Sequence, residues 1–147
     1  MPEQRVTAHQ RQVVVERARG CCEYCRSQAC FATQSFSVEH IKPRSQGGQT
    51  ILDNLALACQ GCNGHKHTKT EGYDPVSREM ALFYHPRQHQ WQDHFRWSDD
   101  FTLIVGLTPI GRATIDVLQL NRESLVNLRQ VLYAMGEHPP SETDEAS

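Results

Sequence analysis

The sequence predicts an α+β fold, in which a small core held together by paired cysteines is followed by a β-hairpin and two helices. Two Cys-x-x-Cys pairs, Cys22–Cys25 and Cys59–Cys62, are separated by 33 residues and enclose the predicted core. Between them, residues 36–41 alternate apolar and polar side chains, as in a strand with one buried face. Near the C-terminus, leucines recur at the spacing of one helix face.

The first predicted element is a helix within an N-terminal segment of residues 1–20. Thr7 is followed three residues later by Gln10, the spacing of a capping box. The helix is expected to run from about Ala8 to Arg19, and Gly20 is expected to end it.

The predicted core covers residues 21–72. A strand over 36–41 is followed by a loop over 42–53, which contains Pro43 and a Gly-Gly pair. A short apolar return strand is expected over 55–58, and a short helix from Asn63 to about Thr70. Residues 72–75, with a glycine and a proline, are expected to break that helix.

The predicted C-terminal extension covers residues 73–136. It is expected to contain a hairpin of residues 94–98 and 101–107, a helix from Pro109 to about Leu120 with Thr108 as its N-cap, and a last helix capped by Asn121. One face of this last helix is expected to carry Leu125, Leu128, Leu132 and Met135.

Charge is distributed unevenly along the chain. The net charge is −2, yet residues 1–69 contain nine Lys/Arg and five Asp/Glu, a balance of +4. Residues 137–147 contain four acidic residues and no Lys or Arg, which predicts a disordered acidic tail. No apolar stretch is long enough for a membrane span and no export signal is visible, so a cytoplasmic protein is expected.

The cysteine pairs predict a structural zinc site. Each pair, here called a knuckle, can offer two thiolates to one tetrahedral zinc ion, and four thiolates leave no open position for catalysis. Disulfides are disfavoured because no export signal is present. Cys21 competes with Cys22 as a ligand, but Cys22 gives the commoner spacing, and Cys30 has no partner.

Further motifs occur in a fixed order around the knuckles. They are Glu39-His40-Ile41-Lys42-Pro43, then Gly47-Gly48, then Asp53-Asn54-Leu55, and, directly after the second knuckle, Asn63 with Lys66 three residues later. In this order the motifs resemble the HNH endonuclease family, and the likeness spans about a third of the chain. The resemblance implies a ββα-metal core, here stapled by zinc, with the C-terminal hairpin and two-helix extension added to it.

The resemblance also implies a metal-dependent endonuclease that hydrolyses phosphodiester bonds in nucleic acid, with DNA the favoured substrate. A neutral histidine can accept a proton from the attacking water, and we assign this role to His40. Glu39 and Asn63 correspond to the family's metal ligands, and their hard oxygen atoms favour magnesium or manganese. Asn54 corresponds to a supporting residue that ties down the loop and orients His40.

Two departures from the family pattern leave an alternative open. The family often has aspartate where Glu39 stands and histidine where Asn63 stands, so His65 or His67 is an alternative source of an imidazole ligand. Phosphate contacts are expected from Lys42, Arg44 and Lys66.

Aromatic and basic residues gather in the extension, among them Trp91 and Trp97. Packing in a second small core is the favoured interpretation, and stacking on unpaired bases is the other. Arg112 and Arg122 lie near predicted helix starts, where a phosphate can bind. Two functions compete with a nuclease: a non-catalytic, zinc-containing nucleic-acid-binding module, and a protein-interaction domain.

Overall fold

A computed structural model describes residues 5–141 of the chain. Helix α1 (Ala8–Arg17) begins with the expected capping box: the Thr7 side chain accepts from the Gln10 backbone, and the Gln10 side chain accepts from the Thr7 backbone. The helix ends two residues earlier than expected, and Arg19 and Gly20 then turn the chain with positive φ angles.

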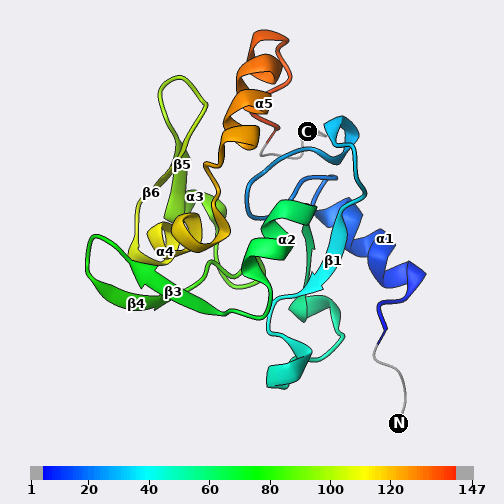
Figure 1. Cartoon of the computed structure of the whole chain (residues 1–147). Helices are drawn as coiled ribbons and strands as arrows, with labels where there is room; N and C mark the ends of the chain where they lie inside the picture. Colours follow the sequence, from blue (N-terminus) through cyan, green and yellow to red (C-terminus); the bar gives the residue numbers. More distant parts are fainter. Residues whose placement is uncertain (1–4, 142–147) are drawn as a thin grey trace.

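The predicted core hairpin is present with the predicted pairing. Strands β1 (Ser37–His40) and β2 (Leu55–Ala58) are antiparallel, and Glu39 lies opposite Ala56. All four residues of β2 are buried, because α1 packs against β2 from one side and helix α2 (Gln60–Lys66) packs against the hairpin from the other (Figure 1). Single 3-10 turns occur at Ala29–Phe31, Arg44–Gln46 and Leu52–Asn54.

Helix α2 differs from the prediction in its position. It begins at Gln60 rather than Asn63, with Cys59 as its N-cap, and it ends at Lys66. The Cys59 thiol accepts a hydrogen bond from the backbone of Cys62, so the second knuckle itself forms the first turn of the helix. Asn63 consequently lies inside the helix, where its N–H bonds to the carbonyl of Cys59.

A second hairpin was not predicted from the sequence. Strands β3 (Glu71–Asp74) and β4 (Glu79–Leu82) pair antiparallel where only a helix break was expected. The Asp74 carboxylate accepts from the backbone N–H groups of Val76 and Ser77, which shapes the turn between the strands. Helix α4 (Pro109–Leu118) packs against both strands, so tertiary contacts stabilise a hairpin whose own sequence is only weakly alternating.

The third hairpin agrees with the prediction. A short helix, α3 (Trp91–His94), leads into β5 (Phe95–Trp97), which pairs with β6 (Ile104–Gly106). Thr108 caps α4 by accepting from Gly111, with proline in the first turn as expected.

Helix α5 (Glu123–Ala134) corrects two details of the prediction. Its N-cap is Arg122 rather than Asn121, whose amide instead exchanges hydrogen bonds with the backbone of Ile104 in β6. Leu125 and Leu132 are buried as expected, but Met135, which follows the last residue of the helix, is 64% exposed.

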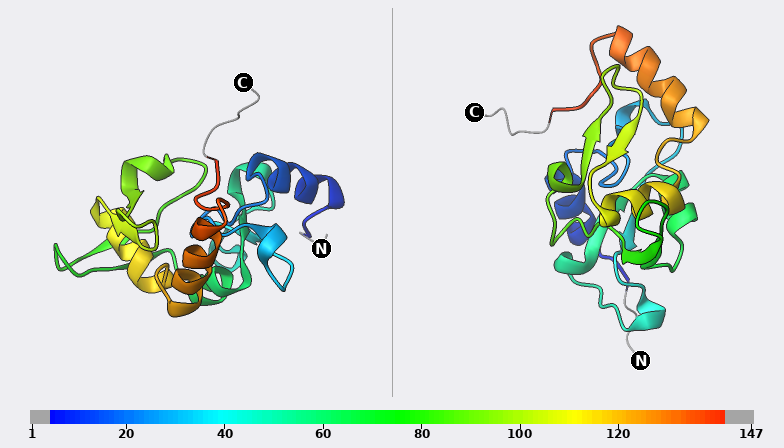
Figure 2. Two further views of the ribbon diagram at one scale, coloured as in Figure 1. Left: turned by 90° about the horizontal axis from the view of Figure 1, so that it is seen from above. Right: turned by 90° about the vertical axis from the view of Figure 1, so that its left-hand side faces the viewer.

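The core and the extension share one hydrophobic cluster. It contains residues of the knuckles and of β2 together with Trp91, Phe95, Leu118 and Leu120 from the extension. The tryptophans therefore pack inside the fold, and Trp97 lies partly buried against the same cluster. In the left view of Figure 2, α1 and the β3–β4 hairpin lie at opposite ends of the molecule.

The first residues of the predicted acidic tail are part of the fold. His138 is buried, its Nε2 lies 2.8 Å from the carbonyl oxygen of Phe101, and its ring packs against Trp97. The rest of the predicted tail, residues 142–147, lies outside the described residues. Within residues 5–141, no helix has both the length and the apolar character that a bilayer crossing requires.

Candidate functional site

The four predicted zinc ligands converge on one point. The Sγ atoms of Cys22, Cys25, Cys59 and Cys62 all lie within 4.8 Å of one another, and all four residues are buried. The Cys25 and Cys59 sulfurs are 3.7 Å apart, close to the spacing expected for thiolates bound about 2.3 Å from one zinc ion. None of the four forms a disulfide. Their chemistry and spacing fit structural zinc.

The structure also decides between the alternative cysteines. Cys21 is buried but does not belong to the four-cysteine cluster, and Cys30 is exposed. In each knuckle the first thiol accepts a hydrogen bond from the backbone of the second cysteine, at 3.5 Å for Cys22 and 3.4 Å for Cys59. Both knuckles therefore have the same local geometry, which the Cys-x-x-Cys spacing allows.

Glu39 lies in the interior between β1 and α2. Its Oε1 atom is 3.1 Å from the Lys66 ammonium, and its Oε2 atom accepts a hydrogen bond from the Tyr24 hydroxyl. Burial raises the pKa of Glu39, whereas the positive charge of Lys66 and the Tyr24 hydrogen bond oppose that rise. The Glu39 carboxylate therefore already binds a cation, which here is an ammonium group.

Lys66 occupies a different position from the one expected of a phosphate contact. Its side chain is only 2% exposed, and its Nζ donates both to Glu39 and to the carbonyl of Ile41 at 3.0 Å. An ammonium held this way is turned toward the interior, so the predicted phosphate contact at Lys66 is replaced by a buried ion pair.

His40 lies at the end of β1 and is half-buried. Its Nε2 atom is 2.8 Å from the hydroxyl of Thr50, across the loop that joins the two strands. Burial lowers the pKa of His40, and the positive charges of Arg44 and Lys66 lower it further. The imidazole is thus held in its neutral form around pH 7, as proton acceptance requires.

Asn54 ties down the loop between β1 and β2. Its Oδ1 accepts from the backbone of Lys42 at 2.8 Å, and its Nδ2 donates to the carbonyls of Lys42 and Gln49. A side chain at Gly48 would overlap the Lys42 carbonyl, so the close approach of these two parts of the loop requires glycine. These contacts hold the backbone at Lys42 and Gln49 against Asn54.

The remaining candidate residues surround this loop and helix. Lys42 and Arg44 are exposed on the loop after β1, and Arg44 is close enough to His40 to affect its pKa. Asn63 is half-buried on α2, while His65 and His67 are exposed. Among the described residues, the four cysteines form the only group of three or more Cys, His, Asp or Glu side chains arranged to hold a metal.

Three residues of the site were not predicted as such. Tyr24 lies between the two cysteines of the first knuckle and bonds to Glu39, and Thr50 lies in the loop and contacts His40, but no local sequence pattern marks either residue. Arg122 donates to the sulfurs of the second knuckle. Its position near a predicted helix start indicated a phosphate contact instead, and only the structure shows it as the N-cap of α5.

A comparison with protein families agrees with this arrangement. Residues 22–69, which contain both knuckles, the β1–β2 hairpin and α2, match the family model described as HNH endonuclease. The match covers 48 of the 147 residues and leaves the extension outside it. No curated protein and no solved structure matches the chain significantly.

Proposed function

Because residues 22–69 match the HNH endonuclease family, we propose that this protein is a metal-dependent endonuclease that hydrolyses phosphodiester bonds, with DNA as its substrate. The observation that carries the proposal is the state of His40. It lies at the end of β1, half-buried and with a lowered pKa, beside a loop that carries exposed basic residues. Water activation requires a neutral imidazole, and the exposed Lys42 and Arg44 side chains beside it have the charge to attract a phosphate.

In this proposal His40 acts as the general base. The Thr50 hydroxyl, 2.8 Å from Nε2, holds one ring nitrogen, which leaves Nδ1 to accept the proton of the attacking water. Asn54 acts at a distance by fixing the loop that carries Thr50 and Arg44 relative to β1. Lys42 and Arg44 bind backbone phosphates of the substrate through their exposed side chains.

The proposed ligands of a catalytic divalent ion are Glu39 and Asn63, whose oxygen atoms suit magnesium or manganese. Glu39 is the residue that best fits a role as metal ligand. Its negative carboxylate already binds one cation, the Lys66 ammonium. When bound, such an ion would neutralise charge that builds up on the scissile phosphate. The ion would have to displace Lys66 from Oε1, so Lys66 competes with it.

The test is cleavage of duplex DNA, single-stranded DNA and RNA by the purified protein in magnesium or manganese. His40→Ala should reduce the rate by about 100-fold or more, the usual scale for loss of a general base. His9→Ala, an exposed histidine on α1, is the matched control and should leave the rate unchanged. His65→Ala tests the alternative ligand.

Two outcomes would contradict the proposal. If the wild-type protein binds all three nucleic acids and cuts none, it is the non-catalytic zinc-containing binding module. If His40→Ala protein cuts as fast as wild type, the base has been assigned to the wrong residue. Cleavage of RNA alone would leave the mechanism in place and replace DNA as the substrate.

A further inference from the structure

Arg122, the N-cap of α5 in the extension, contacts the four-cysteine cluster through its guanidinium group. Arg122 donates from Nη2 to the Cys59 sulfur at 3.4 Å and from Nη1 to the Cys62 sulfur at 3.7 Å. The same Nη1 also donates to the carbonyls of Leu118 and Gln119, where α4 ends. One side chain therefore connects the second knuckle with the junction of α4 and α5.

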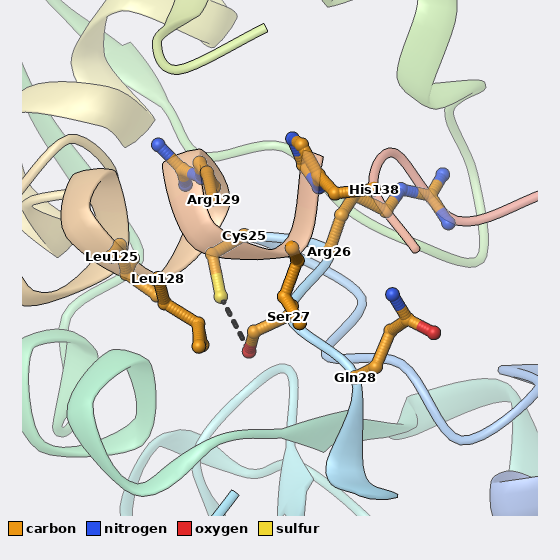
Figure 3. A pocket seen from close by; sticks show the side chains of 9 residues that line it. Cys25, Arg26, Ser27, Gln28, Leu125, Leu128, Arg129 and His138 are labelled. Carbon is orange, nitrogen blue, oxygen red and sulfur yellow. Dashed lines mark hydrogen bonds between the residues drawn. The ribbon is translucent and has the colours of Figure 1, made fainter. Parts of the chain in front are cut away.

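Helix α5 also covers the first knuckle. Figure 3 shows Leu125 and Leu128 of α5 beside the segment that starts at Cys25. The space enclosed between them is about 10 Å³, the lower limit for a single water molecule, so the packing is close. The helix and its N-cap thus lie over both halves of the metal site.

The negative charge of the zinc–thiolate site explains why a guanidinium group beside it is favourable. A zinc ion with four thiolate ligands has a net charge near −2, and this charge is costly to bury without compensation. A guanidinium that donates to two of the sulfurs offsets part of that charge and has the forked shape needed to reach both. Groups that hydrogen-bond to metal ligands typically change metal affinity strongly.

A glycine makes room for the contact. The three atoms nearest to a Cβ added at Gly61 all belong to the Arg122 guanidinium, and the Cβ would overlap it. Gly61 lies inside the second knuckle, so a methyl group there would displace the guanidinium from the sulfurs. By contrast, a Cβ at Gly64, on the same short helix, meets nothing within 4 Å.

We propose that Arg122 is a positioning residue of the zinc centre, which offsets the charge of the Cys59 and Cys62 thiolates and thereby couples zinc retention to the seating of α5 on the core. The extension then has a defined role: it closes the metal site. This inference concerns the structural zinc and is independent of the proposed nuclease activity.

The experiment measures zinc release from the full chain into an excess of a metal-chelating dye. Arg122→Gln and Gly61→Ala should each release zinc about 10-fold faster than wild type. Gly64→Ala is the matched control and should release zinc at the wild-type rate, since both alanines raise helix propensity equally. Arg122→Lys, which keeps the charge but loses the fork, should fall between wild type and Arg122→Gln.

A second measurement tests the coupling without any substitution. Because coupling between two sites is reciprocal, removing zinc should increase amide hydrogen exchange in α5 more than in the distant β3–β4 hairpin. Zinc release within twofold of wild type in both Arg122→Gln and Gly61→Ala would overturn the charge-compensation role. Equal exchange changes in α5 and in the β3–β4 hairpin would overturn the coupling.

Discussion

Replacing Lys66 with methionine tests the central feature of the site, the buried ion pair with Glu39. The two side chains are 2% and 6% exposed, and the Lys66 ammonium also bonds to the carbonyl of Ile41. Methionine has a similar length but no charge, so the substitution leaves a buried carboxylate with the Tyr24 hydroxyl as its remaining partner. Removing one partner of a buried pair costs about 3–5 kcal/mol, and we expect the free energy of unfolding to fall by that amount.

The loss should depend on pH. Burial already raises the pKa of Glu39 and Lys66 opposes that rise, so the pKa should climb further in the Lys66→Met variant. A carboxyl group whose pKa is higher in the folded state than in the unfolded state binds more protons when folded. Its charge therefore destabilises the fold increasingly as pH rises from the unfolded-state pKa to the folded-state pKa, and by a constant amount above that. The deficit should therefore be largest at alkaline pH and shrink as pH falls and Glu39 is protonated.

Urea unfolding followed by tryptophan fluorescence, at pH 5 and at pH 8, measures both effects. Lys69→Met removes an exposed lysine from the turn after α2, and as a control it should change stability by less than about 0.5 kcal/mol. The double variant Glu39→Gln with Lys66→Met removes both charges and should be more stable than Lys66→Met alone at pH 8.

Adding magnesium or manganese makes the same assay report on the proposed metal site. If Glu39 is a metal ligand, the divalent ion should restore stability to Lys66→Met and not to the double variant, because binding to the folded state alone stabilises it. If Lys66→Met unfolds at the same urea concentration as wild type, the ion pair contributes no stability to the fold. Lack of any metal effect on Lys66→Met would remove Glu39 from the ligand set.

Three further predictions concern the other parts of the site. Burial lowers the pKa of His40, as do Arg44 and Lys66, so the enzyme should stay active to a lower pH than a free imidazole base would allow. Arg44→Gln should move the acidic limb of the pH–rate profile to higher pH. A limb that does not move argues against His40 as the base. Asn54→Ala removes three hydrogen bonds, so we expect slower cleavage and a free energy of unfolding in urea that is lower by about 1–3 kcal/mol. The zinc content should stay normal. An unchanged cleavage rate would exclude the loop-fastening role. Cys22→Ser should lower bound zinc, measured by elemental analysis, and destabilise the fold by several kcal/mol; a full zinc content would mean that Cys21 replaces it.

Local sequence patterns were sufficient to predict structures whose interacting residues lie close together along the chain or recur at a regular spacing. The capping box at Thr7 depends on residues three apart, and each knuckle depends on two cysteines three apart. The pairing of β1 with β2 followed from alternation and from the short return strand, since a period of two determines which side chains face inward. The HNH resemblance added a supporting role for Asn54 in the loop, and the structure shows hydrogen bonds from its side chain to that loop.

Other features depended on contacts that no local pattern describes. The β3–β4 hairpin is stabilised by α4, about 30 residues further along, and Asn121 bonds to β6 rather than capping α5. Helix α2 begins at Gln60 because the Cys59 thiol, placed by the cluster, serves as its cap.

For the site, the sequence alone determined which residue types are present and in what order, and therefore the class of chemistry open to this protein. Only the tertiary structure decided which charges meet. Lys66 and Glu39 are 27 positions apart, and Arg122 and Cys59 are 63 apart. A lysine has the same local pattern whether it binds a phosphate at the surface or a carboxylate in the interior, and the difference arises from the burial of Glu39, which makes a nearby cation necessary.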